Sequence, residues 1–257
     1  MRTKHAVVAG AAMGIGEAIA RKLHADGYSV TLIDRIAAKV DAVANELGEG
    51  AFSECADITR PEQLAEAQER IREQAAGVPI LAAVNSVGAY DERRPLMQTD
   101  LAGFNRMLSV NLTGAFLFTQ AFVPLLGKDA ALVHIGSVNG EIAGMELGAY
   151  KVSKAGLNML VRCLALELAR DPRQIRVNAV NPGWVDTPGE RRVQIAEGRP
   201  NILDDPRSFS YIPLKRLTRA SEVADTVAFL CSPAGAGIVG QLLYVDGGIT
   251  IGEVQPQ

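Results

Sequence analysis

Short apolar runs alternate with longer amphipathic stretches along the whole chain. The apolar runs show no polar alternation, which is typical of strands buried on both faces of a parallel sheet, and the amphipathic stretches have helical periodicity. No linker or charge block divides the 257 residues. We expect one α/β domain over residues 1–257, a doubly wound, seven-stranded parallel sheet with helices on both faces. Strands are expected at 5–9, 29–34, 51–55, 81–85, 131–136, 175–181 and 242–246, and helices at 15–26, 37–47, 61–75, 104–126, 150–170 and 221–231.

A glycine-rich turn lies between the first expected strand and the first helix. Gly10, Gly14 and Gly16 give the spacing G-x-x-x-G-x-G, with Met13 and Ile15 between them. Glycines here permit a tight turn and close approach of the backbone to a pyrophosphate, and the helix N-terminus offers N–H donors to phosphates. Any three glycines can also form a purely structural turn. The strand before and the helix after favour a Rossmann-type nucleotide site.

Asp34 ends the second expected strand, eighteen residues after Gly16. A carboxylate there can accept hydrogen bonds from the adenosine ribose hydroxyls, which favours NAD(H). It would repel a 2′-phosphate at about 5 Å by roughly 3 kcal/mol per unit charge at an effective dielectric constant of about 20. Arg35 partly offsets this repulsion. The alternative is that Asp34 is only a solvated strand end.

Tyr150 and Lys154 lie four positions apart at the start of an expected helix, so both side chains fall on one face. A free tyrosine titrates near 10, and acid/base chemistry near neutrality requires a pKa lower by about 3 units. A neighbouring cation typically supplies about 1 to 3 units by favouring the phenolate. Alone, the pair is equally compatible with two exposed side chains on a helix surface.

Together these motifs resemble the short-chain dehydrogenase/reductase family, in its single-domain, NAD-preferring branch, over nearly the whole chain. The glycine turn is similar to the family's T-G-x-x-x-G-I-G, although Ala9 stands where the threonine is usual. The family's N-N-A-G reads N-S-V-G at 85–88. The other matching motifs, in order, are Asp57-Ile58, Val110-Asn111-Leu112, Ile135-Gly136-Ser137, Tyr150-x-x-x-Lys154, Pro182-Gly183 and Asp246-Gly247-Gly248.

The resemblance implies a role for each matched residue. Tyr150 would be the general acid/base, and Lys154 would favour its phenolate and hydrogen-bond the nicotinamide ribose. Ser137 would bind the substrate oxygen, and Asn111 would hold a water in a proton relay to Lys154. The residues expected to contact the cofactor are Gly10, Met13, Gly14, Ile15, Gly16, Asp34, Asp57, Ile58, Asn85, Gly88, Tyr150, Lys154, Pro182, Gly183, Val185 and Thr187.

The net charge and the cysteine spacing indicate which kinds of binding partner are expected. A net charge of -3 and the lack of a basic stripe argue against nucleic-acid binding. Cys55, Cys163 and Cys231 are widely spaced and suggest neither a zinc site nor a disulfide framework, so no metal is expected. The apolar run after the N-terminus is too short for a signal peptide or a membrane span. We expect a cytoplasmic protein with a small-molecule substrate.

The periodic pattern weakens between residues 184 and 217, which predicts an irregular substrate-binding loop. Candidate substrate walls, each equally compatible with ordinary packing, are Tyr90, Met145, Leu147 and Trp184. The arginine pairs Arg93-Arg94 and Arg191-Arg192 raise the hypothesis of an anionic substrate group. Their acidic neighbours Asp91, Glu92 and Glu190 weaken any local positive field, so solvated surface charge is the alternative.

The leading hypothesis is an NAD-dependent alcohol dehydrogenase that interconverts a secondary, cyclic or diol alcohol and a ketone by direct hydride transfer. The alternatives are an NADPH-dependent ketoreductase, such as a 3-oxoacyl thioester reductase, and a non-catalytic NAD-sensing protein. The Tyr-x6-Lys spacing of enoyl reductases is absent. The resemblance also implies a homotetramer, with interfaces on helices 104–126 and 150–170 and a second contact at 242–257.

Overall fold

All seven expected strands form one parallel sheet in the computed structural model, which describes residues 2–90 and 93–252. The sheet order is β3-β2-β1-β4-β5-β6-β7. Strands β2 and β3 therefore lie on one side of β1, and β4 to β7 lie on the other side. In such sheets the crevice where ligands bind lies at the carboxyl ends of the strands, where the strand order reverses, here between β1 and β4. The strands are β1 Lys4–Ala9, β2 Tyr28–Asp34, β3 Ala51–Cys55, β4 Ile80–Asn85, β5 Leu126–Ile135, β6 Arg176–Pro182 and β7 Leu242–Val245.

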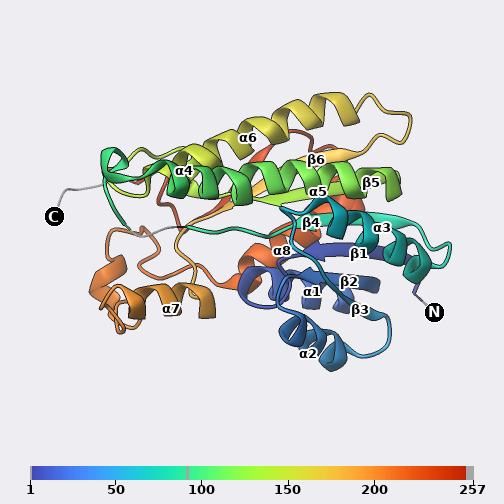
Figure 1. The fold of residues 1–257 in the computed structure, drawn as a ribbon, viewed down its shortest axis with the longest axis horizontal. Helices are drawn as coiled ribbons and strands as arrows, with labels where there is room; N and C mark the ends of the chain where they lie inside the picture. Colours follow the sequence, from blue (N-terminus) through green and yellow to red (C-terminus); the bar gives the residue numbers. More distant parts are fainter. Residues whose placement is uncertain (1, 91–92, 253–257) are drawn as a thin grey trace.

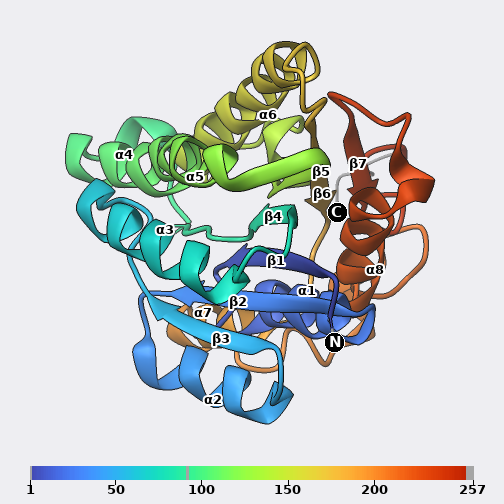
Figure 2. The same cartoon turned by 90° about the vertical axis from the view of Figure 1, so that its right-hand side faces the viewer.

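Helices cover both faces of the sheet (Figures 1 and 2). Because side chains alternate along a strand, β1 feeds two cores. Ala6 and Val8 face the helices α1, α2 and α8, whereas Val7 and Ala9 face α3, α5 and α6. This confirms the predicted doubly wound fold. The α-helices are α1 Gly14–Ala25, α2 Ala37–Leu47, α3 Pro61–Ala75, α4 Leu101–Leu108, α5 Gly114–Phe122, α6 Gly148–Leu168, α7 Pro188–Ala196 and α8 Ala220–Cys231.

The helix predicted at 104–126 is a composite. It begins as α4, changes to a π-helical turn at Ser109–Thr113, continues as α5 and ends in a 3₁₀ turn, Val123–Leu125. Residues 101–125 are long and apolar enough to span a membrane. However, the segment packs against α3 and α6 and buries Asn111 in its π turn, as a helix of a soluble protein does. Such π turns frequently occur at functional sites.

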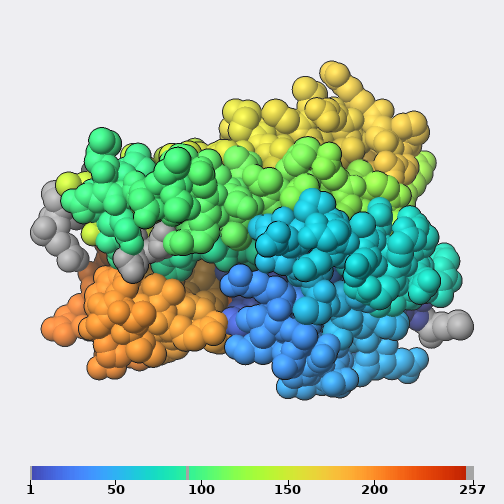
Figure 3. All heavy atoms as spheres, viewed as in Figure 1, coloured from blue at the N-terminus to red at the C-terminus, as the bar shows by residue number. Residues whose placement is uncertain are grey.

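The segment predicted as an irregular loop contains a helix instead. Helix α7 and a short 3₁₀ turn, Pro206–Phe209, lie within 184–217. Thr187 caps α7 by accepting a hydrogen bond from Glu190 N, and Pro188 follows at the first helical position. The segment forms its own protrusion, coloured orange in Figures 1 and 3, at the carboxyl end of the sheet. Of the expected contact at 242–257, residues 253–257 lie outside the described part of the chain, as do Asp91 and Glu92.

Candidate active site

The glycine turn has the geometry that a bound pyrophosphate requires. Gly10 and Gly14 have positive φ angles of 78° and 63°, which favour glycine. A Cβ on Gly16 would lie 2.0 Å from the Gly10 carbonyl oxygen, so only glycine lets α1 pack this closely against the turn. No side chain caps the N-terminus of α1 at Met13, which leaves its N–H groups available to an anion. The turn therefore fits a dinucleotide.

Two carboxylates follow the strands next to this turn. Asp34 accepts hydrogen bonds from Ala12 N at 3.2 Å and from Ile36 N at 3.1 Å, which fixes it at the end of β2 beside the turn. Asp57 accepts bonds from the amide and the hydroxyl of Thr59 at 2.9 and 2.7 Å. Burial would raise the pKa of Asp57, but these bonds outweigh it and hold that pKa below its usual value. Both carboxylates line the same cavity as the glycine turn.

Tyr150 and Ser137 meet across the carboxyl ends of β5 and β6. Ser137 follows β5 and is 7% exposed, and its Oγ accepts a hydrogen bond from Asn139 N at 3.1 Å. The Ser137 and Tyr150 side chains line the same cavity, and the Ser137 hydroxyl is close enough to Tyr150 to favour the phenolate form and lower its pKa. Tyr150 lies in the first turn of α6, as the sequence predicted. A substrate oxygen between these two hydroxyls would meet both a proton carrier and a hydrogen-bond donor.

The electrostatics of the pair differ from the prediction. Burial raises the pKa of Tyr150 above its ordinary 10, against the opposing effect of the Ser137 hydroxyl, and the Glu190 charge raises it further. The Lys154 ammonium lies 5.9 Å from the centre of the Tyr150 ring and donates to the Ile135 carbonyl at 2.9 Å. Burial lowers the pKa of Lys154 to about 8. In the protein alone, desolvation dominates and Lys154 is not among the groups that shift the Tyr150 pKa, so that pKa is raised and not lowered.

Two predicted residues lie behind the cavity wall. Asn85 is 2% exposed, and its Oδ1 accepts a bond from Val87 N. Asn111 is 1% exposed, and its side chain pairs with both the N–H and the C=O of Ala89 at 2.8 Å and donates to Ser153 Oγ at 2.9 Å. Instead of contacting a cofactor, Asn85 shapes the loop after β4. The Asn111 side chain is already occupied by protein partners, so a relay water would have to be held by its backbone.

The remaining predicted residues line the cavity. Pro182 and Gly183 end β6, and a Cβ on Gly183 would lie 2.8 Å from Asp246 Cα. Val185 forms a bridge with Thr218, and the Thr187 side chain lies next to Gly14. The cavity has a volume of about 1180 Å³, above the range of about 300–1,000 Å³ that is usual for ligand pockets, which leaves room for a dinucleotide and a substrate. Tyr90, Met145, Leu147 and Trp184 also line it, as predicted for a substrate wall.

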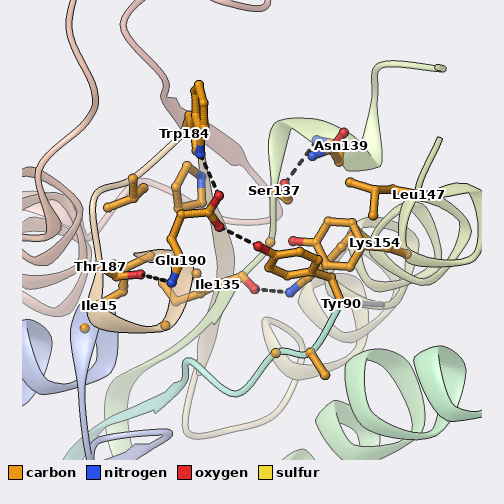
Figure 4. Close-up of a pocket in the computed structure, with 18 of the residues that line it drawn as sticks. Ile15, Tyr90, Ile135, Ser137, Asn139, Leu147, Lys154, Trp184, Thr187 and Glu190 are labelled. Carbon is orange, nitrogen blue, oxygen red and sulfur yellow. Dashed lines mark hydrogen bonds between the residues drawn. The ribbon is translucent and has the colours of Figure 1, made fainter. Parts of the chain in front are cut away.

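Glu190 is a site residue that the sequence did not reveal. It stands in the first turn of α7 and accepts hydrogen bonds from Tyr90 Oη, Trp184 Nε1 and Gln194 Nε2 at 2.8, 2.8 and 2.7 Å (Figure 4). Tyr90 comes from the loop after β4, so Glu190 ties α7 to the opposite wall of the cavity. In the sequence, Glu190 is one charge in a run of charges within an expected loop, and only the pair Thr187-Pro188, which is typical of a helix start, could have indicated that it lies in the first turn of a helix.

Lys151 is a second such residue. Its ammonium donates to Asn139 Oδ1 and to the Ile142 carbonyl, which ties the segment after Ser137 to α6. Burial lowers the pKa of Lys151, and the Arg93 charge lowers it further. Lys151 is one of the three undefined positions of the Tyr-x-x-x-Lys pattern. Nothing in that pattern indicates that its side chain has a role at the site.

The arginine pairs separate in the structure. Arg93 and Arg192 line the cavity, whereas Arg191 is paired with Asp186 and Asp204 at 2.8 and 3.0 Å outside it. Arg93 is itself paired with Glu197 at 3.2 Å. Arg192 reaches Met13 at the glycine turn, which is the expected cofactor end of the cavity. Within residues 2–90 and 93–252, the ion pairs of Arg93 and Arg191 and the position of Arg192 at the glycine turn give no arginine cluster beside Tyr150 for an anionic substrate group.

A glycine turn for a dinucleotide and a Ser-Tyr-Lys group at one end of a doubly wound sheet define a nicotinamide-dependent oxidoreductase. Comparison with known proteins agrees. The family model described as enoyl-(acyl carrier protein) reductase matches residues 10–250. The chain is 36% identical to galactitol 2-dehydrogenase (L-tagatose-forming) of Cereibacter sphaeroides, covering 96% of this chain and 94% of that one. The chain belongs to the short-chain dehydrogenase/reductase family.

Other relatives act on different substrates. The chain is 34% identical to cis-4-hydroxycyclohexanecarboxylate dehydrogenase of Sinomonas cyclohexanicum, covering 95% of this chain and 96% of the relative. It is 33% identical to 3-oxoacyl-[acyl-carrier-protein] reductase FabG of Aquifex aeolicus, covering 97% and 98%. The crystal structure of gox2181 superposes with a TM-score of 0.86 at 27% identity, covering 98% of this chain and 97% of that one.

Proposed function

We propose that this protein is an NAD(H)-dependent dehydrogenase that interconverts a secondary alcohol and a ketone. The observation that carries the proposal is the placement of Tyr150 and Ser137 in the same cavity as the glycine turn and Asp34. The relatives that act on galactitol and on hydroxycyclohexanecarboxylate support a secondary, cyclic or diol carbinol as the substrate.

The residues divide the chemistry between them. When bound, the oxidised nicotinamide ring accepts the hydride that leaves the carbinol carbon. Ser137 holds the substrate oxygen, and Tyr150 takes the hydroxyl proton during oxidation or returns it during reduction. Lys154 adds positive charge near Tyr150, and since its ammonium has three N–H donors, the bond to Ile135 O leaves others for the nicotinamide ribose. Gly88 lies beside it, where a Cβ would approach Lys154 Nζ to 3.4 Å, so this wall must remain small.

The preference for NAD over NADP rests on Asp34. Its carboxylate is anchored by two backbone amides and keeps acceptor capacity for the two ribose hydroxyls. We infer that NADH binds at least tenfold more tightly than NADPH. Titration of both cofactors can be followed by the fluorescence of Trp184, the only tryptophan, which lines the cavity. The Asp34→Ser variant should lose most of the preference for NADH. Equal affinities of the wild-type protein for NADH and NADPH would reject the role proposed for Asp34.

A second candidate is an NADPH-dependent ketoreductase, such as a 3-oxoacyl thioester reductase. Arg35 favours it, because this exposed cation lines the cavity next to Asp34 and could pair with a 2′-phosphate. The FabG relative is of this class. Tighter binding of NADPH together with reduction of an acetoacetyl thioester would establish this alternative.

We also propose that the protein is cytoplasmic and that it forms a homotetramer, in line with the family resemblance.

A further inference from the structure

We propose that Glu190 and Tyr90 form a subsite for a second hydroxyl group of the substrate, so that the natural substrate is a polyol or vicinal diol. This inference rests on the proposed dehydrogenase function and names its substrate class. It starts from a feature that the dehydrogenase chemistry leaves unused, a carboxylate on the cavity wall beside the acid/base tyrosine (Figure 4).

The hydrogen-bond inventory shows what the subsite can bind. A carboxylate has about four acceptor positions, and the described donors Tyr90, Trp184 and Gln194 occupy three. Tyr90 has one hydroxyl proton and directs it to Glu190, which leaves its own oxygen as an acceptor. Burial and the hydrogen bond to Glu190 raise the pKa of Tyr90, so it keeps this proton at working pH. The pair therefore presents acceptors and fits an incoming O–H or N–H donor.

The subsite is close enough to Tyr150 to act on the same substrate molecule. The Tyr90 and Tyr150 rings meet edge to face, with centres 5.9 Å apart. Glu190 is also close enough to oppose ionisation of the Tyr150 phenol. When a substrate oxygen is bound by Tyr150 and Ser137, the carbon adjacent to the carbinol carbon faces Tyr90 and Glu190. A hydroxyl on that carbon would donate to Tyr90 Oη or Glu190 Oε2.

The same arrangement discriminates by charge. Because Glu190 makes phenolate formation harder, it is a disadvantage for oxidation of a plain alcohol, and recognition of a second donor gives it a function. A substrate carboxylate in this position would face the Glu190 charge and the Tyr90 acceptor oxygen, while the nearby Arg93 cation is already paired with Glu197. The structure therefore favours the polyol chemistry of the galactitol relative over the hydroxy acid chemistry of the cyclohexanecarboxylate relative.

The test compares paired substrates that differ by one hydroxyl. Cyclohexanol is paired with 1,2-cyclohexanediol, and 2-butanol with 2,3-butanediol, in both diol configurations and with saturating NAD⁺. The wild-type kcat/KM should favour the diol. Glu190→Gln and Tyr90→Phe should each lower kcat/KM for the diol by about 10- to 100-fold, since a hydrogen bond to a charged group is worth about 1.5–3 kcal/mol. The value for the mono-alcohol should not fall in either variant, and Glu190→Gln should raise it because the phenolate then forms more easily.

Controls separate recognition from folding. Glu197→Gln removes a carboxylate of the same segment that pairs with Arg93 and does not line the cavity, and it should leave the diol preference intact. NADH affinity by Trp184 fluorescence should be unchanged in every variant. Tyr90→Phe keeps Glu190 and its bonds to α7, so it remains informative if Glu190→Gln folds poorly.

Either of two results would overturn the subsite. One is an equal loss on the diol and the mono-alcohol in both variants, which would make Glu190 and Tyr90 merely structural. The other is a wild-type protein without any diol preference. If no alcohol is oxidised at all, the dehydrogenase proposal fails; the subsite is then judged by saturable diol binding to the NADH complex, which Tyr90→Phe should weaken and whose absence rejects it.

Discussion

At the scale of single residues, the acid/base group shows that burial and a cation act in opposite directions. The sequence correctly placed Tyr150, Lys154 and Ser137 together, because a helical spacing of four and a strand end fix their positions. It did not predict the protonation equilibrium, which depends on how deeply the side chains lie. Burial raises the pKa of Tyr150 and lowers that of Lys154 to about 8. The positive charge of an oxidised nicotinamide, when bound, would lower the pKa of Tyr150 and favour the phenolate.

We predict that the Tyr150 phenol titrates above pH 10 in the free protein and at a lower pH in the NAD⁺ complex. Alcohol oxidation needs the phenolate, so kcat should rise with pH through the lower value and then level off. Ultraviolet difference titration of tyrosinate, with and without NAD⁺, measures both values, and Tyr150→Phe identifies the signal that belongs to this residue. An NAD⁺ complex whose phenol titrates no lower than in the free protein would contradict the prediction.

Lys151 leads to a second residue-scale prediction. Because it ties Asn139 and the Ile142 carbonyl to α6, Lys151→Met should loosen the segment that holds Ser137. We expect kcat to fall about tenfold, while NADH affinity stays within about twofold. Lys151→Arg should recover part of the loss. A change in NADH affinity as large as the change in kcat would show general damage to the site instead.

At the scale of elements, the buried strands were predictable because continuous apolar runs allow few other structures. Their observed ends lie within one residue of the expected ones, except that β5 begins at Leu126 and not at 131. Helix α7 was not predicted, since its polar sequence carries only a weak apolar period and its start depends on the Thr187 cap and Pro188. The π turn around Asn111 was equally invisible. It results from tertiary contacts, in which a buried amide pairs with Ala89, and no local propensity encodes these.

The glycine turn gives a direct element-scale prediction. Gly16→Ala would place a methyl group 2.0 Å from the Gly10 carbonyl oxygen and force α1 away from the turn. We expect loss of NADH binding by more than tenfold and a lower melting temperature. Gly237→Ala is the matched control, because a Cβ there meets no atom within 4 Å and the backbone is not left-handed. Comparable behaviour of the two variants would be inconsistent with this packing.

The π turn gives another element-scale prediction. Asn111→Leu leaves the N–H and C=O of Ala89 without their side-chain partners, and each such loss typically costs about 1–3 kcal/mol. We expect the free energy of unfolding to fall by about 3 kcal/mol and the substrate KM to rise, because Ala89 and Tyr90 share one loop. Asn105→Leu changes an exposed asparagine of α4 and should do neither. Urea denaturation measures the difference.

At the scale of the whole molecule, the central sheet buries two histidines away from the active cavity. Burial lowers the pKa of His5 in β1 to about 4 and that of His134 in β5 to about 3. In the unfolded chain both titrate near 6.5, so the unfolded state binds more protons at acidic pH. The stability they contribute is complete above about pH 6.5 and is lost as the pH falls toward 3.

Acidic pH should therefore lower the free energy of unfolding, and replacing one of the two histidines should reduce this loss. Between pH 7 and pH 5 each histidine should remove about 2 kcal/mol of unfolding free energy. His5→Gln can keep the hydrogen bond to Thr31 and should lose only about half as much over that range as the wild-type protein. Chemical denaturation at both pH values provides the comparison. Identical pH dependence in the two proteins would mean that His5 is not buried in its neutral form.

Assembly also belongs to this scale. The outer face of α6 exposes Val152, Met159 and Leu166, of which Leu166 is 60% exposed, and such a stripe fits the proposed homotetramer. Light scattering should give the mass of four chains, and Leu166→Glu should reduce it. A monomeric wild-type protein at micromolar concentration would reject this assembly.

The most direct test of the central claim follows a single hydrogen atom. A secondary alcohol, such as 2,3-butanediol deuterated at the carbinol carbons, is oxidised with NAD⁺ by the wild-type protein and by Tyr150→Phe, and the reduced cofactor is analysed by mass spectrometry and NMR. The account predicts one deuterium at C4 of the nicotinamide with the wild-type protein. The variant should bind NADH normally but turn over at least a thousandfold more slowly, about 4 kcal/mol in barrier. An unlabelled reduced cofactor, or full activity in the variant, would contradict it.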